Sequence, residues 1–157
     1  MTLDVKLKWQ ELIKKKKVEL DLKLPKMYWL IGRKFGLSTK NKILLYNQVI
    51  KIVWTYGIQL WGCTSQANIE TIQRFQNKVL RMIVNAPWYI RNTDLYRDLG
   101  IKTVAHEIQR YAKDHVLSLR QHVNEEVSRL ILSGSQERRL KRVRPSDLAV
   151  INSGGLQ

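Results

Sequence analysis

Apolar residues recur every three or four positions along several segments of the chain, and this spacing restricts the fold more than any other feature. Between Thr39 and Gly57 the apolar positions are Ile43, Tyr46, Val49, Ile50, Val53 and Trp54. Such spacing places them on one wide face of a helix. A similar pattern begins near Ser65 or Asn68 and stops before Pro87. Because no two segments alternate like paired strands, we predict an all-α fold, an irregular bundle of about five helices.

Glycine, proline and capping residues predict where the other elements end. A first helix is expected over Trp9 to Leu24, with Pro25 starting a fresh turn that runs to Gly32, since proline is tolerated best at a first helical position. Ser38 is expected to cap the next helix. The remaining predicted elements are a short extended or irregular bridge over Ile58–Trp61, a short helix over Thr93–Leu99 between Asn92 and Gly100, a long helix from Thr103 towards His122, and a helical restart at Asn124 for Glu125–Leu132.

Positive charge is in large excess for a chain of this length. The 157 residues carry 28 Lys and Arg against 13 Asp and Glu, a formal charge of +15. The span Leu22 to Ile69 has basic residues and no acid. A polyanionic partner is the first expectation, because basic side chains that neutralise phosphates release counterions. Membrane surfaces and acidic proteins also bind basic proteins.

Cysteine content and hydropathy indicate the cellular location of the chain. Cys63 is alone in the sequence, so it closes no internal disulfide, and an intracellular location in the cytoplasm or nucleus is expected. The uncharged run Ile52 to Ile69 contains too many polar residues for a bilayer helix. We therefore expect no membrane-spanning helix. We also predict that neither a membrane nor a small-molecule substrate is a partner.

A basic helical face is the first candidate site. Lys40 and Lys42 lie at the start of one predicted helix, while Arg74, Lys78 and Arg81 are spaced i, i+4 and i+7 along the next. Residues with that spacing share a face and match regularly spaced backbone phosphates. A solvated polar face is the alternative interpretation. The cluster Lys14–Lys17 is a weaker candidate, since four consecutive lysines point all round a helix.

Aromatic residues are the second candidate. Trp88 and Tyr89 follow Pro87 in a predicted loop, where their rings are available for stacking on bases. The other aromatic residues are expected mostly in the core, Tyr28 and Trp54 among them, because these two fall on apolar helical faces.

Catalytic and metal-binding patterns are weak. His115 and His122 lie two helical turns apart, about 10 Å along the axis, too far to chelate one metal. Asp94 and Asp98 are spaced for a shared cation, yet acids in a first turn are explained by the helix dipole. Gly-rich phosphate loops and nucleophile elbows do not occur in the sequence. We predict no catalytic residue and no metal ligand in this chain.

Four strings resemble a known family. They are MTLDVKLKW at Met1–Trp9, KMYWLIGRKFGLSTKNKILLYNQVI at Lys26–Ile50, WTYGIQLWG at Trp54–Gly62 and IQRFQNKVLRMIVNAPWYIRNTDLYRDLGI at Ile72–Ile101. Together they resemble the region downstream of the palm in reverse transcriptases of jockey-type non-long-terminal-repeat retrotransposons. The resemblance covers roughly Met1 to Ile108, and arguably continues to the basic segment Arg138–Leu148.

The resemblance implies a division of the chain. Residues 1–8 would be a remnant of the primer-grip region, residues 9–62 thumb-like helices, residues 63–132 a C-terminal helical region and residues 133–157 a flexible basic tail. The family's F/Y-x-D-D box, whose aspartates bind magnesium, does not occur in the sequence. We therefore expect a truncated open reading frame that starts at an internal methionine, lacks palm and fingers, holds no cofactor and is inactive alone.

The resemblance also gives the basic residues a role. A polymerase thumb grips the backbone of template and primer without reading sequence, so Lys40, Lys42, Arg74, Lys78 and Arg81 would contact phosphates of an RNA or RNA/DNA duplex. Faces that once covered the palm would leave exposed apolar residues. Two alternatives stay open: a small basic module that binds an acidic protein, and a degenerate element copy without function.

Overall fold

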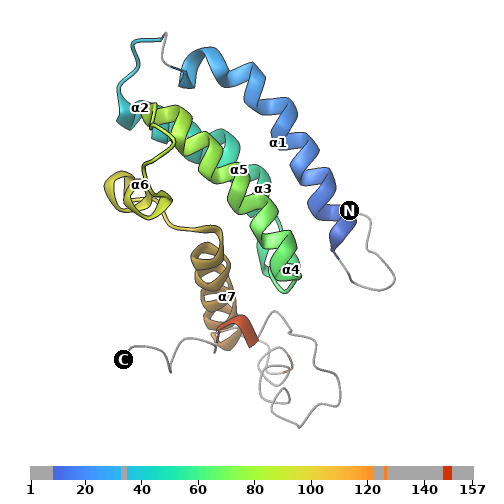
Figure 1. The fold of residues 1–157 in the computed structure, drawn as a ribbon. Coiled ribbons are helices and arrows are strands. Elements are labelled where there is room, and N and C mark those ends of the chain that lie inside the picture. The colour runs from blue at the N-terminus through green and yellow to red at the C-terminus, as the bar shows by residue number, and fades with distance from the viewer. Residues whose placement is uncertain (1–8, 33–34, 122–125, 127–146, 150–157) are drawn as a thin grey trace. The chain divides into compact units, whose positions relative to one another are not determined.

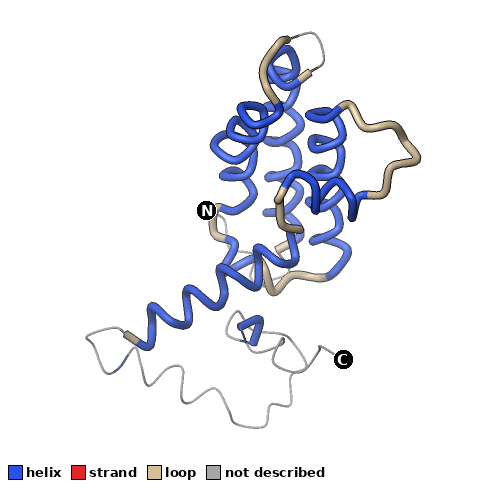
Figure 2. The backbone as a smooth tube through the Cα atoms, turned by 90° about the vertical axis from the view of Figure 1, so that its left-hand side faces the viewer, coloured by secondary structure: helices blue, strands red, loops and turns tan. Residues whose placement is uncertain are grey.

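Helices form along most of the chain in the computed structural model, which describes residues 9–32, 35–121, 126 and 147–149 (Figure 1). In chain order the elements are α1 (Gln10–Ile31), α2 (Thr39–Leu45), the π-helical segment η1 (Tyr46–Lys51), α3 (Ile52–Thr55), α4 (Ile58–Trp61), α5 (Gln66–Val84), α6 (Asn92–Leu99), α7 (Val104–Arg120) and a 3₁₀ turn, η3 (Asp147–Ala149). The described residues contain no strand, which confirms the all-α prediction for this part of the chain (Figure 2). The predicted restart at Asn124 and the tail Arg138–Arg144 lie outside the described residues.

The described residues fall into two compact units. The first unit contains the chain up to Gly57 together with Thr64–Val104, and the second contains Ile58–Cys63 together with the residues from Ala105 onward. In the first unit α1 packs on α3 and α5, and α2 also packs on α5. The candidate site residues therefore all belong to the first unit.

Helix α1 passes through Pro25 without a break, so the prediction of a fresh turn at this residue is wrong. The missing N–H of Pro25 leaves the carbonyl of Asp21 without its helical donor. Both residues are exposed, where water supplies a replacement. The opposite side of the helix is buried on both sides of the proline, at Ile13, Lys16, Leu20, Leu24, Met27 and Ile31. Packing of this continuous face outweighs the lost hydrogen bond.

The predicted helix after Ser38 is one continuous helical segment made of α2, η1 and α3. Ser38 caps it as predicted, with its side-chain oxygen accepting a hydrogen bond from the backbone N–H of Asn41 at 3.4 Å. Lys42, Tyr46 and Ile50 are spaced by four residues, share one face of this segment and are all buried. The segment ends before Gly57, whose positive φ of 67° suits glycine.

The stretch Ile58–Trp61 is a helical turn, α4, and the prediction of an extended or irregular bridge is wrong. Gly62 N–H donates to the Ile58 carbonyl at 2.9 Å, and Ile58 and Trp61, spaced i and i+3, are both fully buried. A Cβ atom at Gly62 would lie 2.7 Å from Ile108 Cγ2 and 2.7 Å from the Ile58 carbonyl oxygen. Glycine at this position lets α4 approach α7 closely within the second unit.

Helix α5 provides the central apolar face of the first unit. It begins at Gln66 after Ser65 and ends at Val84, and the next residue, Asn85, adopts the left-handed conformation with φ 53°. Its buried apolar residues are Ile72, Phe75, Val79, Leu80 and Ile83. Helix α6 ends at Leu99, before Gly100 as predicted, and Gly100 has a positive φ. Asn92 was expected to cap this helix but is its first residue, and Arg91 stands at the N-cap position.

Candidate nucleic-acid interface

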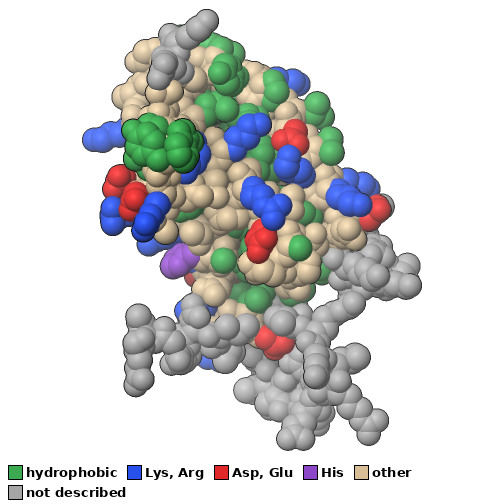
Figure 3. All heavy atoms as spheres, viewed as in Figure 1, with side chains coloured by type: hydrophobic (Ala, Val, Ile, Leu, Met, Phe, Trp, Pro, Cys, Tyr) green, Lys and Arg blue, Asp and Glu red, His purple; other side chains and the backbone are tan. Residues whose placement is uncertain are grey.

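Three of the predicted phosphate contacts are exposed. Lys40 lies in the first turn of α2, and Arg74 and Lys78 lie one turn apart on α5. Arg74 Nη2 is 3.2 Å from Glu70 Oε2, and both side chains are largely in solvent, so this ion pair constrains the guanidinium only weakly. Figure 3 shows Lys and Arg side chains on one face of the molecule, among exposed apolar side chains and with Asp and Glu beside several of them.

Lys42 differs from the expectation of a solvent-facing cation. Its side chain is 7% exposed, and its ammonium donates to the Gly32 carbonyl oxygen at 2.9 Å. Gly32 follows the last residue of α1 and Lys42 belongs to α2, so the bond links the two helices across their connection. This charge is used inside the fold.

Arg81 also has internal partners. Its guanidinium donates to the carbonyls of Pro87, at 2.9 Å, and of Ile90. It also donates to Oδ1 of Asn92, at 3.2 Å from Nε and 3.0 Å from Nη2. The planar fork of arginine suits several acceptors at once. Arg81 therefore ties α5 to the following turn and to the first residue of α6.

The turn held by Arg81 carries the two predicted stacking residues. Ile90 N–H donates to the Pro87 carbonyl at 3.2 Å, which places Trp88 and Tyr89 at the two central positions of the turn. Trp88 is 90% exposed and Tyr89 is 66% exposed. Their ring centroids are 6.0 Å apart at an interplanar angle of 82°. In Figure 2 the connection between α5 and α6 is a wide tan loop that projects from the helices.

Lys16 is a structural cation that sequence reasoning missed inside the Lys14–Lys17 cluster. Only 6% of its surface is exposed, and its ammonium donates to the carbonyls of Val53, at 2.9 Å, and Tyr56, at 2.8 Å. The ammonium also lies 5.5 Å from the centroid of the Tyr56 ring. Burial lowers the pKa of Lys16, and the nearby Glu19 carboxylate opposes that shift. Lys16 thus binds the C-terminal end of α3 to α1.

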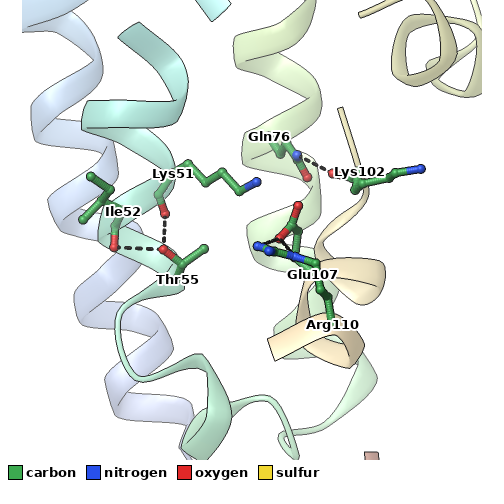
Figure 4. A network of polar contacts seen from close by, with 7 residues as sticks. All are labelled: Lys51, Ile52, Thr55, Gln76, Lys102, Glu107 and Arg110. Carbon is green, nitrogen blue, oxygen red and sulfur yellow. Dashed lines mark hydrogen bonds and ion pairs between the residues drawn. The ribbon is translucent and has the colours of Figure 1, made fainter. Parts of the chain in front are cut away.

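Side-chain amides on α5 form a second set of contacts that sequence reasoning missed. Gln73 Oε1 accepts from the backbone N–H of Val104 at 2.9 Å. The Gln76 amide, fully buried, donates to the Lys102 carbonyl at 3.0 Å (Figure 4). Gln73 also donates to Asn77 Oδ1 at 3.1 Å. The signal in the sequence was three amides at i, i+3 and i+4 beside an apolar face, because buried amides need partners.

Tyr96 completes this amide network from α6. Its hydroxyl donates to Asn77 Oδ1 and accepts from the Gln73 side-chain amide. Burial raises the pKa of Tyr96 to about 12, with the Gln73 hydrogen bond acting in the opposite direction. The network holds α6 and the start of α7 against α5, and so fixes the surface on which the turn between α5 and α6 is mounted.

Acidic residues and histidines do not gather into a metal site within the described residues. No group of three or more His, Cys, Asp or Glu side chains there is arranged to hold a metal ion. Asp94 and Asp98 both face Arg97, at 3.0 and 3.7 Å. The histidines His106 and His115 are exposed.

Exposed apolar residues are numerous, as the resemblance predicted. On α1, Val18, Leu22 and Trp29 are more than half exposed and are spaced by four and seven residues, so they share one helical face. Trp29 contacts Phe35 edge to face, with ring centroids 5.3 Å apart. Tyr28 is also more than half exposed, so its prediction as a core residue is wrong. Trp54, by contrast, is fully buried as predicted.

None of the helices in the described residues combines the length and the hydropathy needed to cross a bilayer.

Comparison with known proteins identifies the group to which the chain is related. It is 38% identical over 146 residues to a Drosophila melanogaster protein named "Probable RNA-directed DNA polymerase from transposon X-element", an alignment that covers 93% of this chain and 16% of that protein. It is 31% identical over 156 residues to the Drosophila melanogaster "RNA-directed DNA polymerase from mobile element jockey", covering 94% of this chain and 17% of that protein. No family model matches the chain, and no solved structure matches it significantly.

These relatives confirm the resemblance carried by the four sequence strings. The chain spans about a sixth of the length of the curated relatives that it matches. The similarity to several of them extends along about nine-tenths of the chain, whereas one shared motif would match only a short stretch. The chain is thus a relative of one segment of the RNA-directed DNA polymerases of jockey-type and related mobile elements.

Proposed function

We propose that the chain is a helical, thumb-like segment of a retrotransposon RNA-directed DNA polymerase that grips the template and primer backbone without reading sequence. The observation that carries the proposal is the exposed pair Arg74 and Lys78, one turn apart on a helix whose other cation, Arg81, is held by the adjoining turn. Lys40, exposed on α2, adds to this basic face.

Charge supports nucleic acid as the partner. Between Glu70 and Asp94 the chain has basic residues at Arg74, Lys78, Arg81 and Arg91 and no acid. Long flexible cations on one helix follow a phosphate backbone but read no base edges. Binding of an RNA or RNA/DNA duplex by this face is therefore expected to be weak, sensitive to salt and tolerant of sequence. Nucleotide addition would require the palm, whose paired carboxylates this sequence does not contain.

The proposal is tested by salt titration of binding to a random RNA/DNA duplex. The double variant Arg74→Ala/Lys78→Ala is expected to bind about tenfold more weakly, and the slope of log K against log salt should fall by about 1 to 2, as two phosphate contacts predict. The matched control is Lys26→Ala/Lys113→Ala, which removes the same charge from exposed positions of α1 and α7 that belong to no candidate site.

Two results would contradict the proposal. One is the absence of binding at low salt by the unchanged chain. The other is equal loss in the two double variants, which would mean that the total charge matters and the α5 face does not. Binding of an acidic protein with affinity that depends on Arg74 and Lys78, together with no binding of duplex, would favour the interaction-module alternative.

A further inference from the structure

The turn between α5 and α6 presents aromatic rings on a backbone that is already fixed. Arg81 donates to the carbonyls of Pro87 and Ile90, the first and last residues of the turn, and the turn's own hydrogen bond joins the same two residues. Asn92 anchors the guanidinium at the start of α6. The backbone of the turn is therefore ordered before a ligand binds, so binding loses little further conformational entropy there.

The rings on this turn are exposed to solvent and accessible to a ligand. Trp88 has 90% of its surface in solvent, and its only described ring neighbour is Tyr89, nearly perpendicular to it. The two rings meet edge to face, and the exposure of Trp88 leaves ring surface open on which a flat ligand can stack. A tryptophan that is almost fully exposed adds little apolar burial to the stability of the fold, so its ring is available for a ligand.

Charge around the turn indicates which flat ligand fits. Arg91 follows the turn and is exposed, and Lys78 lies one helical turn before Arg81 on α5. The nearest acid in the sequence after the turn, Asp94, is 3.0 Å from Arg97. An aromatic ligand that also carries negative charge complements this surface, and an unpaired nucleotide has both features.

We propose that Trp88 and Tyr89 form a stacking platform for an unpaired base next to the gripped duplex, and that Arg81 is the positioning residue that holds the platform in shape. This proposal rests on the proposed function, because the duplex bound by Arg74 and Lys78 brings the unpaired strand to the turn. Arg81 itself contacts backbone carbonyls and not the nucleotide.

The test compares two RNA/DNA duplexes of equal length, one blunt and one with a short unpaired extension that contains 2-aminopurine. Trp88→Ala in the full chain is expected to weaken binding of the extended duplex about tenfold and to change binding of the blunt duplex less than about twofold. Trp29→Ala is the matched control, since Trp29 is 59% exposed on α1. It should change neither affinity. Because Trp88 is almost fully exposed, its removal leaves the fold intact.

Arg81→Lys tests the positioning role separately. Lysine keeps the charge but has no planar fork to reach Pro87, Ile90 and Asn92 together. We expect the same selective loss on the extended duplex, and no further loss when Arg81→Lys is combined with Trp88→Ala, because both act through one platform. Arg74→Lys is the control for the exchange itself and should keep the preference for the extension.

The outcomes separate the two proposals. If Trp88→Ala affects neither duplex while Arg74→Ala/Lys78→Ala weakens both, the platform is overturned and the backbone grip stands. If the unchanged chain fails to bind the blunt duplex but binds the extended one through Trp88, the grip is overturned and the platform stands. Equal loss on both duplexes from Trp88→Ala overturns the platform, as does wild-type behaviour of Arg81→Lys.

Discussion

Two regions of the first unit use cations to hold backbone carbonyls, and they do so in different ways. In the region α1–α3, Lys16 and Lys42 are buried, and each places one ammonium on carbonyls from another helix or its end. In the region α5–α6, Arg81 is only half-buried and spreads its fork over a turn and a helix start. A buried ammonium joins helices, whereas the planar guanidinium shapes a surface loop.

The comparison shows how far a count of charges can mislead. The sequence predicts one set of phosphate contacts that contains both exposed and internal cations. Lys40, Arg74 and Lys78 are exposed, whereas Lys42 and Arg81 bond to carbonyls within the fold. Exposure divides them, because a cation that is already bonded to carbonyls must give up those bonds before it binds a phosphate. The two regions therefore respond differently when their cations are removed.

The largest effect is expected from Lys16→Ala. The change removes a charged donor from the carbonyls of Val53 and Tyr56 and leaves a cavity, so the free energy of unfolding should fall by about 2–3 kcal/mol. Urea unfolding measures it. Lys14→Ala, exposed on the same helix, is the matched control and should change stability by less than about 0.5 kcal/mol. Equal, small changes in both variants would show that the buried ammonium adds nothing to stability.

A smaller effect is expected from Arg81→Met. Loss of the hydrogen bonds to Pro87, Ile90 and Asn92 should lower the free energy of unfolding by about 1–2 kcal/mol. The loss is limited because water reaches the partly exposed acceptors and replaces some of these hydrogen bonds. Urea unfolding of Arg81→Met beside Lys16→Ala ranks the two regions directly. A loss as large as that of Lys16→Ala would contradict the distinction between a helix-joining cation and a loop-shaping one.

The smallest effect is a pH dependence of opposite sign in the two regions. The pKa of Lys16 is lowered by burial, so between that value and 10.5 the unfolded chain binds more protons and stability rises with pH. The pKa of Tyr96 is raised to about 12, so from pH 10 to 12 the folded chain keeps a proton that the unfolded chain loses, and stability falls. The measurement is the free energy of unfolding at each pH.

Single variants assign each slope. Lys16→Met should lose the rise below pH 10.5 while keeping the fall above pH 10, and Tyr96→Phe should show the reverse. The comparison uses slopes with pH and not absolute stabilities, because each substitution also changes packing. If both variants keep both slopes, other groups are responsible for them.

Apolar spacing and capping residues were enough to predict most helices, including the ends at Gly57 and Gly100. They failed at Pro25 and at Ile58–Trp61, where tertiary packing outweighs local preference: a continuous buried face carries α1 past the proline, and burial of Ile58 and Trp61 closes a helical turn. Local sequence does not contain either contact.

The candidate site could be predicted only in part. Helical spacing places Arg74 and Lys78 on one face, and Pro87 predicts a loop in which Trp88 and Tyr89 are exposed. The sequence could not predict the partners of the internal cations, because Lys16 binds carbonyls 37 and 40 residues further along the chain. Spacing along one helix says which side a cation faces, but not which carbonyl meets it there.

The path of the chain between its two units limits how the molecule can be divided. The chain leaves the first unit after Gly57, returns to it at Thr64 and leaves again after Val104. Neither unit is one uninterrupted stretch of sequence. A fragment that stops at Val104 would keep Ile58 and Trp61 but remove Ile108, which meets the same segment at Gly62. Truncation therefore cannot isolate the α5–α6 surface cleanly, and point substitutions in the whole chain are the appropriate means of dissecting it.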